Sequence, residues 1–207
     1  MQEHAPARGS AVAAAPRFVL DRREAVPALI GRHEDFLIVT GLAGTARDVA
    51  ALTRDGAHTF TMAGAMGGAC MIGLGLALAR RERRVLVVTG DGELLMNVGA
   101  LATIAVMNPP NLAIVCVDNG HYGETGMQAS HTKAGIDLVA VALGCRFKHA
   151  RAISRIEEAA EVRKLLHAGE GPILVSARIS EEDVPRVLPI RDGHAIKQRF
   201  IAALNRA

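Results

Sequence analysis

The chain has 207 residues, half of them apolar, with 3% aromatic residues and a formal net charge of +3. This length and apolar content can bury one substantial core, so residues 18–207 are expected to form a single domain. The basic residues are dispersed along the chain, a pattern that favours a small anionic ligand over nucleic acid.

The chain is expected to begin with an arm and then to enter a sheet. Residues 1–17 are rich in Ala, carry scattered charge and lack the apolar centre of a signal peptide, so a disordered arm is expected. The pattern then predicts a helix at 21–30, a strand at 35–40 and a glycine-rich loop at 41–45 that precedes another helix.

Residues 62–79 form an uncharged run of 18 residues, which is the minimum length for a membrane span. The run contains five glycines, is followed by the charged residues 80–84, and leads directly into a strand. These features favour a buried helix of small residues that packs closely on a sheet. We therefore expect no membrane segment.

A β-α-β unit follows, with strands at 84–89 and 112–117 and a helix between them at 93–107. A crossover of this kind makes the strands parallel and brings their carboxyl ends to one edge, where ligands of open α/β folds bind. The expected fold class is α/β, a three-layer open parallel sheet with helices on both faces.

Polar residues follow both strands at that edge. Asp91 comes after the first strand and Asn119 after the second, and a main-chain carbonyl in the turn after Asn119 offers a third oxygen. Mg²⁺ prefers such a set, completed by phosphate and water. Gly92 lets the backbone approach phosphate, and the N–H groups of the helix expected from Glu93 would point at it. The alternative is an ordinary strand-to-helix turn.

The remaining elements carry no evident chemistry. Ser154 and Glu157 have the spacing of a capping box that opens a helix to about His167, a strand is expected at 173–177, and a final helix at 194–205. The three cysteines, Cys70, Cys116 and Cys145, are widely spaced in or beside apolar segments. No disulfide framework is therefore expected, and a reducing cytoplasm is favoured.

The segment Gly90-Asp91-Gly92, answered 28 residues after Asp91 by Asn119, resembles the diphosphate-binding half of thiamine diphosphate enzymes. The resemblance implies that Asp91 and Asn119 bind Mg²⁺ through their side chains and His121 through its carbonyl. Where the family often has Asn-Asn, this chain has Asp118 before Asn119, so only the metal-binding position is kept.

The resemblance also extends upstream to Gly64-Ala65-Met66-Gly67. It implies that Met66 supports the two rings of the cofactor in a bent conformation, a task that suits an adaptable apolar side chain. The loop at 41–45 would contact the far phosphate, although a plain glycine-rich turn fits equally well. The complete set of residues expected to bind the cofactor is Gly41, Gly44, Thr45, Gly64, Met66, Gly90, Asp91, Gly92, Glu93, Asn119, His121, Tyr122 and Gly123.

A narrower resemblance, to sulfopyruvate and phosphonopyruvate decarboxylases, is carried by residues 61–67, 90–104 and 118–128. It implies a thiamine diphosphate- and Mg²⁺-dependent decarboxylation of a small anionic 2-oxo acid. Two departures concern substrate identity. Glu93 replaces the small hydroxyl residue common after Gly-Asp-Gly, and Ala129-Ser130-His131 replaces an expected Pro-Thr. His131 is interpreted as a solvated loop residue.

The family uses a Glu from a separate pyrimidine-binding domain to activate the cofactor, and 207 residues cover only the diphosphate half. The chain is therefore expected to be the β subunit of a hetero-oligomer such as α2β2 or larger, with a pyrimidine-domain α subunit as partner. Apart from positioning by Met66, no catalytic residue is expected in this chain. Two alternatives remain open: a carboligase subunit similar to acetolactate synthase, and a non-catalytic module that binds thiamine diphosphate.

Overall fold

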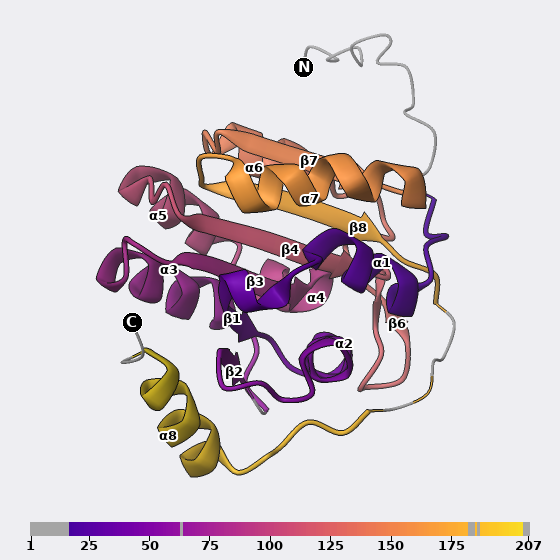
Figure 1. The fold of residues 1–207 in the computed structure, drawn as a ribbon. Helices are drawn as coiled ribbons and strands as arrows, with labels where there is room; N and C mark the ends of the chain where they lie inside the picture. The colour runs from indigo at the N-terminus through magenta and orange to yellow at the C-terminus, as the bar shows by residue number, and fades with distance from the viewer. Residues whose placement is uncertain (1–16, 63, 182–184, 186, 205–207) are drawn as a thin grey trace, which may run out of the picture.

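The computed structural model describes residues 17–62, 64–181, 185 and 187–204. Its centre is a six-stranded sheet in the order β2-β1-β3-β4-β8-β7, in which every neighbouring pair is parallel (Figure 1). The strands are β1 (Phe36–Thr40), β2 (Thr59–Thr61), β3 (Arg84–Gly90), β4 (Leu112–Asp118), β7 (His149–Ile153) and β8 (Ile173–Arg178). The predicted α/β fold with an open parallel sheet is confirmed.

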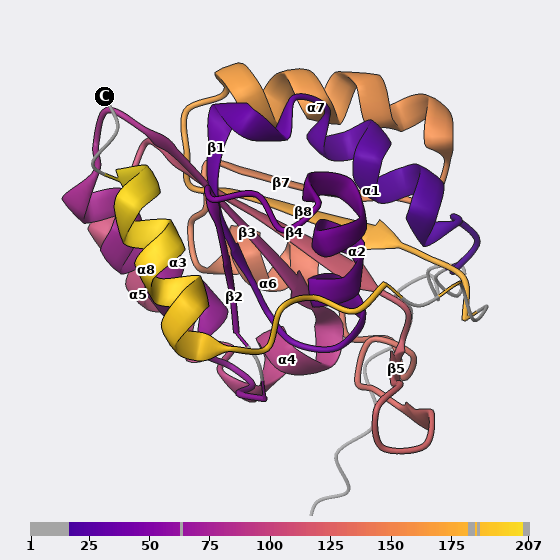
Figure 2. The same ribbon diagram turned by 60° about the horizontal axis from the view of Figure 1, so that its bottom comes forward.

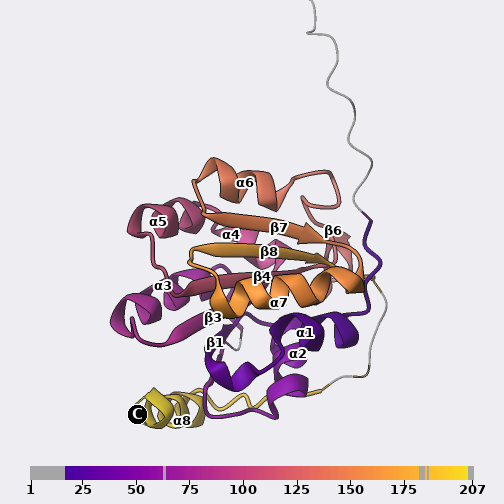
Figure 3. The same cartoon turned by 45° about the horizontal axis from the view of Figure 1, so that its top comes forward.

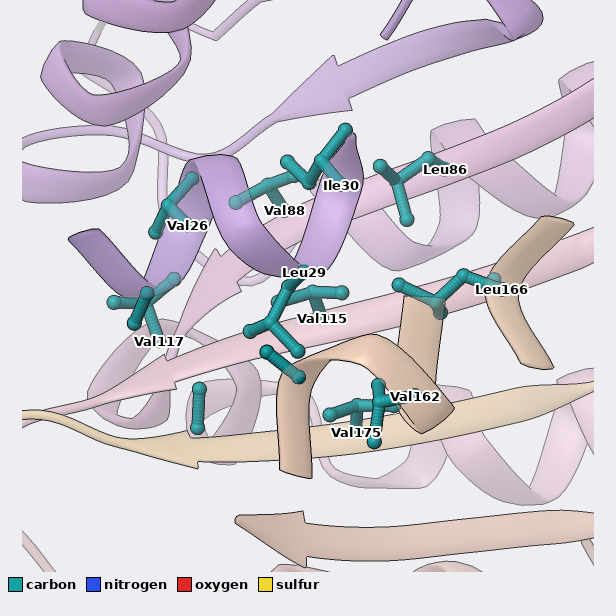
Figure 4. Close-up of a cluster of buried hydrophobic side chains, with 14 of the residues drawn as sticks. Val26, Leu29, Ile30, Leu86, Val88, Val115, Val117, Val162, Leu166 and Val175 are labelled. Atoms are coloured by element: carbon teal, nitrogen blue, oxygen red, sulfur yellow. The ribbon is translucent and has the colours of Figure 1, made fainter. Parts of the chain in front are cut away.

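Helices cover both faces of the sheet, as predicted. One face packs against α1 (Arg22–Ile30), α2 (Gly44–Thr53) and α7 (Ala159–Ala168), and Figure 4 shows part of this cluster, with Leu29 of α1 near Val115 of β4. The other face packs against α3 (Ala69–Ala79), α4 (Asp91–Met96), α5 (Gly99–Met107), α6 (Leu138–Gly144) and α8 (Gly193–Leu204).

Successive residues of a strand point alternately into the apolar clusters on the two faces of the sheet, because the strand is pleated. In β1, Phe36 and Ile38 belong to one cluster, and Leu37 and Val39 belong to the other. Because both faces are covered, β1, β3, β4 and β8 read as continuous apolar runs. This is why the sequence alone located these four strands.

Helix α3 confirms a helix of small residues that packs closely on the sheet, although only its sheet-facing side is buried and Met71 and Ile72 are exposed. A Cβ atom added to Gly73 would lie 2.2 Å from Cγ2 of Val87 in β3, so only glycine allows the helix to approach the sheet this closely. The helix begins at Ala69, so the described residues 64–68 of the uncharged run precede it. No helix among the described residues is long and apolar enough to cross a membrane.

The prediction of one helix over 93–107 was wrong. Helix α4 begins at Asp91 and ends at Met96, and α5 begins at Gly99. The chain breaks at Asn97, whose ψ of 52° is not helical and whose side-chain amide donates to the carbonyl of Gly67 at 3.0 Å. Apolar residues continue at helical spacing across the break, so the pattern could not show it.

Other boundaries also differ from the predictions. Glu158, rather than Glu157, accepts hydrogen bonds from the backbone N–H groups of Ser154 and Arg155, each at 3.1 Å, and a short 3-10 turn (Ile156–Glu158) precedes α7. The final helix α8 ends at Leu204, and Asn205 lies outside the described residues, as does the expected arm apart from Arg17.

Several elements were not anticipated from the sequence. These are β2, β7, α6, the 3-10 turn His33–Asp35 and a hairpin of β5 (His121–Tyr122) and β6 (Gln128–Ala129). Helix α8 packs along the β2 edge of the sheet, where Phe200 contacts Phe60 with ring centroids 5.6 Å apart (Figures 1 and 3). This long-range contact protects the edge of a short strand that has little apolar pattern of its own.

Candidate active site

The carboxyl ends of β1, β3, β4 and β8 border a cavity of about 470 Å³. Helices α2 and α4 and the β5–β6 hairpin lie around this edge of the sheet (Figures 1 and 2). The cavity is lined by Arg22, Leu42, Ala43, Gly44, Thr45, Arg47, Met66, Gly90, Asp91, Gly92, Glu93, Val117, Asn119, His121, Tyr122, Gly123, Glu124, Thr125, Met127, Ser180 and Glu181.

All the residues predicted to bind the cofactor line this cavity except Gly41 and Gly64. Gly41 instead lies against the carboxyl group of Glu93. A Cβ atom added to Gly41 would fall 1.6 Å from Oε2 of Glu93. Gly64 has a φ of 91° and open space around it. Met66 is 40% exposed and lines the cavity, so it is not a core methionine.

The two glycines that flank Asp91, Gly90 and Gly92, differ in the space that a side chain would have at each position. A Cβ at Gly90 would meet no atom within 4 Å, so this position is open. A Cβ at Gly92 would lie 2.3 Å from the ring of Tyr122, so glycine is needed there to seat the hairpin. From the sequence, Gly92 was expected only to let the backbone approach phosphate.

Asp91 is buried and fixed by two hydroxyl groups that sequence reasoning missed. Its Oδ2 accepts a hydrogen bond from Ser130 Oγ and lies 3.0 Å from Thr132 Oγ1. The Thr132 hydroxyl also lies 2.7 Å from Asp118 Oδ1. Ser130 and Thr132 come from the segment after β6, and only the departure at Ala129-Ser130-His131 marked it.

Asp118 and Asp91 are buried together. Burial, and next the charge of Asp91, raises the pKa of Asp118 to about 6. The backbone N–H of Gly120 donates to Asp118 Oδ1 at 3.0 Å and partly compensates this charge. Two buried carboxylates at one site favour a bound cation, which would offset their repulsion.

The three predicted metal donors all line the cavity. Asp91 follows β3, Asn119 follows β4, and His121 opens β5. Among the described residues no three His, Cys, Asp or Glu side chains cluster as a metal site. The predicted donor set uses one carboxylate, one amide and one carbonyl, which suits a hard ion that keeps phosphate and water ligands.

The imidazole of His121 is engaged locally. Its Nδ1 lies 2.9 Å from the carbonyl of Asn119 and 3.6 Å from Oε1 of Glu181, while its backbone N–H donates to Asn119 Oδ1 at 3.1 Å. These contacts hold the turn between Asn119 and His121. His131 is exposed and does not line the cavity, in agreement with a solvated loop residue.

Glu93 is 5% exposed, and neither of its carboxyl oxygens has a hydrogen-bond partner among the described residues. Burial raises the pKa of Glu93, against the smaller opposing effect of nearby donors. The nearby donors are the Thr89 hydroxyl and the backbone N–H groups of Leu42, Gly90 and Ala69. None of them has the distance and angle of a hydrogen bond to the Glu93 carboxyl oxygens.

Two arginines that the sequence analysis did not consider also line the cavity. Arg22 forms an ion pair with buried Asp48 at 2.7 Å, and Arg47 of α2 pairs with Glu124 of the hairpin at 2.6 Å. The Thr45 hydroxyl donates to the Leu42 carbonyl at 2.9 Å, which stabilises the turn into α2. The site therefore combines the buried carboxylates Asp91 and Asp118 with basic residues that suit an anionic ligand.

The predicted donor set is of the kind that magnesium prefers. Comparison with known proteins shows the family to which the chain belongs. Residues 43–177 match the family described as "Thiamine pyrophosphate enzyme, C-terminal TPP binding domain". The chain belongs to this family.

Two relatives show which enzymes the sequence of this chain is similar to. The chain is 40% identical over 185 residues to sulfopyruvate decarboxylase subunit beta of Methanothermobacter thermautotrophicus, covering 88% of this chain and 95% of the relative. It is 37% identical over 145 residues to phosphonopyruvate decarboxylase of Streptomyces viridochromogenes, covering 70% of this chain but 36% of that protein.

Among solved structures, the fold is similar to 2-oxoglutarate:ferredoxin oxidoreductase from Magnetococcus marinus. The TM-score is 0.59 at 19% identity, covering 86% of this chain and 72% of that chain. At this identity the likeness supports the fold alone.

Proposed function

We propose that this chain is the β-type subunit of a thiamine diphosphate- and Mg²⁺-dependent decarboxylase that acts on a small anionic 2-oxo acid of the sulfopyruvate or phosphonopyruvate kind. The main support is that Asp91, Asn119 and His121 border one cavity in a chain similar over almost its whole length to a sulfopyruvate decarboxylase β subunit.

Each part of the cavity has a role in this proposal. Asp91 and Asn119 hold the metal through side chains and His121 through its carbonyl. Gly90 leaves space for the diphosphate, the start of α2 at Gly44 and Thr45 holds the far phosphate, and Met66 supports the rings. The bound cofactor supplies a nucleophilic carbon and an electron sink for the bond that loses CO₂.

The basic residues at the cavity fit the charge of the substrate. Arg22 and Arg47 line the cavity, and each already pairs with a carboxylate, Asp48 and Glu124 respectively. The two guanidinium groups attract a dianionic substrate that binds beside them. When the substrate leaves, Arg22 and Arg47 remain paired with Asp48 and Glu124, so neither arginine is left as an isolated charge. This supports a sulfonate- or phosphonate-bearing acid rather than an uncharged substrate.

A partner subunit is supported by an apolar surface over α3 and α5, which contact each other (Figure 1). Residues 62–79 and 94–110 carry no charge. The exposed large apolar side chains are Met71 and Ile72 on α3, Val106 and Met107 on α5, and Met96 and Val98 at the junction of α4 and α5. An α subunit with a pyrimidine-binding domain would cover this face and supply the activating Glu, in an α2β2 or larger assembly.

The location of the protein is part of the same proposal. Cys70, Cys116 and Cys145 are free thiols, and burial raises the pKa of Cys70 to about 12, which makes that thiol unreactive. Free thiols are typical of the reducing cytoplasm.

The test is CO₂ release from sulfopyruvate, phosphonopyruvate and pyruvate, with product analysis, for the chain with and without its partner. We expect turnover only with the partner, because a missing acid–base group alone lowers rate by about 10² to 10⁴. An aldehyde product indicates decarboxylation, and a longer hydroxy-keto product indicates carboligation. Full turnover by the chain alone would refute the split-subunit proposal and direct attention to Glu93 and Glu124.

A further inference from the structure

Arg22 and Arg47 both line the cavity, but their carboxylate partners hold them with different strength. Asp48 is buried, with 1% of its side chain exposed, and it accepts three hydrogen bonds from Arg22 at 2.7–3.1 Å. Glu124 has 46% of its side chain exposed, and one bond of 2.6 Å joins it to Arg47. An exposed ion pair contributes little to stability, so Arg47 is the arginine that a ligand can engage at small cost.

The side chain of Arg47 has donor groups to spare. Among the described residues, only its Nη2 group has a hydrogen-bond partner, the Oε1 atom of Glu124. The N–H groups on Nε and Nη1 are therefore available, and 22% of the side chain is exposed beside the cavity. A guanidinium group is always charged, and its planar fork of donors matches the oxygens of an acid group.

Arg47 lies toward the solvent side of the cavity. Arg22 lies against the start of α2, because a Cβ atom added to Gly44 would fall 2.2 Å from its Nη2. Arg47 is three residues further along α2 and reaches the loop of the β5–β6 hairpin, of which residues 122–125 line the cavity (Figure 2). The residues of this loop are exposed from 123 onward. A group bound to Arg47 can therefore exchange with solvent, as a substrate must.

The chemistry of the proposed substrates gives such an arginine a task. Sulfopyruvate and phosphonopyruvate each carry a carboxylate and a second acid group. The carboxylate leaves as CO₂, so it cannot hold the molecule in place throughout the reaction. The second acid group is unchanged from substrate to product. Binding energy from a part of the substrate that does not react can be used to orient the part that does.

We propose that Arg47 binds the sulfonate or phosphonate group of the substrate and thereby selects which 2-oxo acids are accepted, an inference that rests on the proposed function. Glu124 acts through Arg47: it holds the guanidinium group by the bond to Nη2, and its own negative charge opposes an anionic ligand nearby. Pyruvate has no second acid group, so it gains no bond to Arg47. The arginine therefore favours dianionic acids over pyruvate.

The test is steady-state kinetics of the assembled complex, saturated with thiamine diphosphate and Mg²⁺. Arg47→Gln should lower kcat/KM for sulfopyruvate and phosphonopyruvate by about tenfold or more, because a charged hydrogen bond is lost. For pyruvate, measured as a substrate or as a competitive inhibitor, the change should be less than about threefold. Glu124→Gln should raise kcat/KM for the two dianionic acids by about two- to fivefold, because Gln keeps an oxygen that accepts from Nη2 but removes the opposing charge.

The two substitutions separate substrate binding from a structural role. Both break the same ion pair, so a mere tie between α2 and the hairpin would make them act in the same direction, whereas the proposal requires opposite directions. Arg151→Gln and Glu161→Gln are matched controls, because Arg151 of β7 and Glu161 of α7 form an ion pair of the same length, 2.6 Å, and neither lines the cavity. Neither control should change kcat/KM for any of the acids.

Equilibrium binding of thiamine diphosphate to the assembled complex provides a second measurement. Neither Arg47→Gln nor Glu124→Gln should change its Kd by more than about threefold. A loss of about tenfold or more in Arg47→Gln would assign the arginine to the diphosphate and overturn the proposal. Equal losses on all three acids, or effects of the same sign in the two variants, would also overturn it. A wild-type complex that turns over none of the three acids would instead refute the proposed function.

Discussion

Replacing Asp91 by Asn separates its proposed metal role from a structural role. Asn keeps the shape of Asp and an oxygen that can accept from Ser130 and Thr132, but it removes the negative charge. Because burial and then the charge of Asp91 raise the pKa of Asp118, removing that charge relieves repulsion. The ligand-free variant should therefore be as stable as wild type or more stable.

The effect on ligand binding should have the opposite sign. Thiamine diphosphate with Mg²⁺ at about a hundred times its Kd stabilises the folded state by roughly 2.7 kcal/mol. In a chain of this size each kcal/mol moves Tm by about 2–4 °C, so wild type should gain roughly 5–11 °C. If Asp91→Asn weakens binding a hundredfold, the same ligand concentration leaves about 0.4 kcal/mol, and a rise of roughly 1–2 °C.

The assay is thermal unfolding of the assembled complex with and without thiamine diphosphate and Mg²⁺. Asp137→Asn is the matched control, because Asp137 caps α6 away from the cavity and Asn is an equally good N-cap. The control should keep the full rise in Tm. The reasoning is wrong if Asp91→Asn unfolds well below wild type without ligand yet keeps the whole ligand-induced rise.

Three further predictions use pairs of substitutions. In the isolated chain, Gly73→Ala should lower the free energy of unfolding by about 1–2 kcal/mol, because the added methyl group overpacks against β3. Gly75→Ala should raise the free energy of unfolding by about 0.5–1 kcal/mol, because its methyl group meets open space. Equal effects of the two substitutions in denaturant titrations would contradict the close packing at Gly73. Met66→Ala should lower kcat far more than the folded fraction, and Met66→Leu should be mild; activity falling only with folded protein would indicate a packing role. Gly41→Ala should destabilise wild type more than it destabilises Glu93→Ser, and additive effects on unfolding would exclude their contact.

The sequence determined the central architecture because this information is local. Strands β1, β3, β4 and β8 are short apolar runs bounded by turn residues, and a β-α-β crossover has one favoured hand. The parallel strands therefore had to bring Asp91 and Asn119 to one edge, which the structure confirms. The membership in the thiamine pyrophosphate enzyme family was likewise predicted from motifs, and the comparisons confirm it. The metal and cofactor roles of individual residues stay predictions.

Tertiary structure decided everything that depends on contacts between distant segments. Ser130 and Thr132 reach Asp91 across 39 and 41 positions of sequence, and Arg47 meets Glu124 across 77. The break between α4 and α5 depends on a bond from Asn97 to Gly67, although the apolar spacing continues through it. Periodicity records which face of an element is buried, but it carries no information about which polar group lies opposite. For that physical reason the sequence located the edge of the sheet that holds the site, while only the folded chain showed that Ser130 and Thr132 hold Asp91 there.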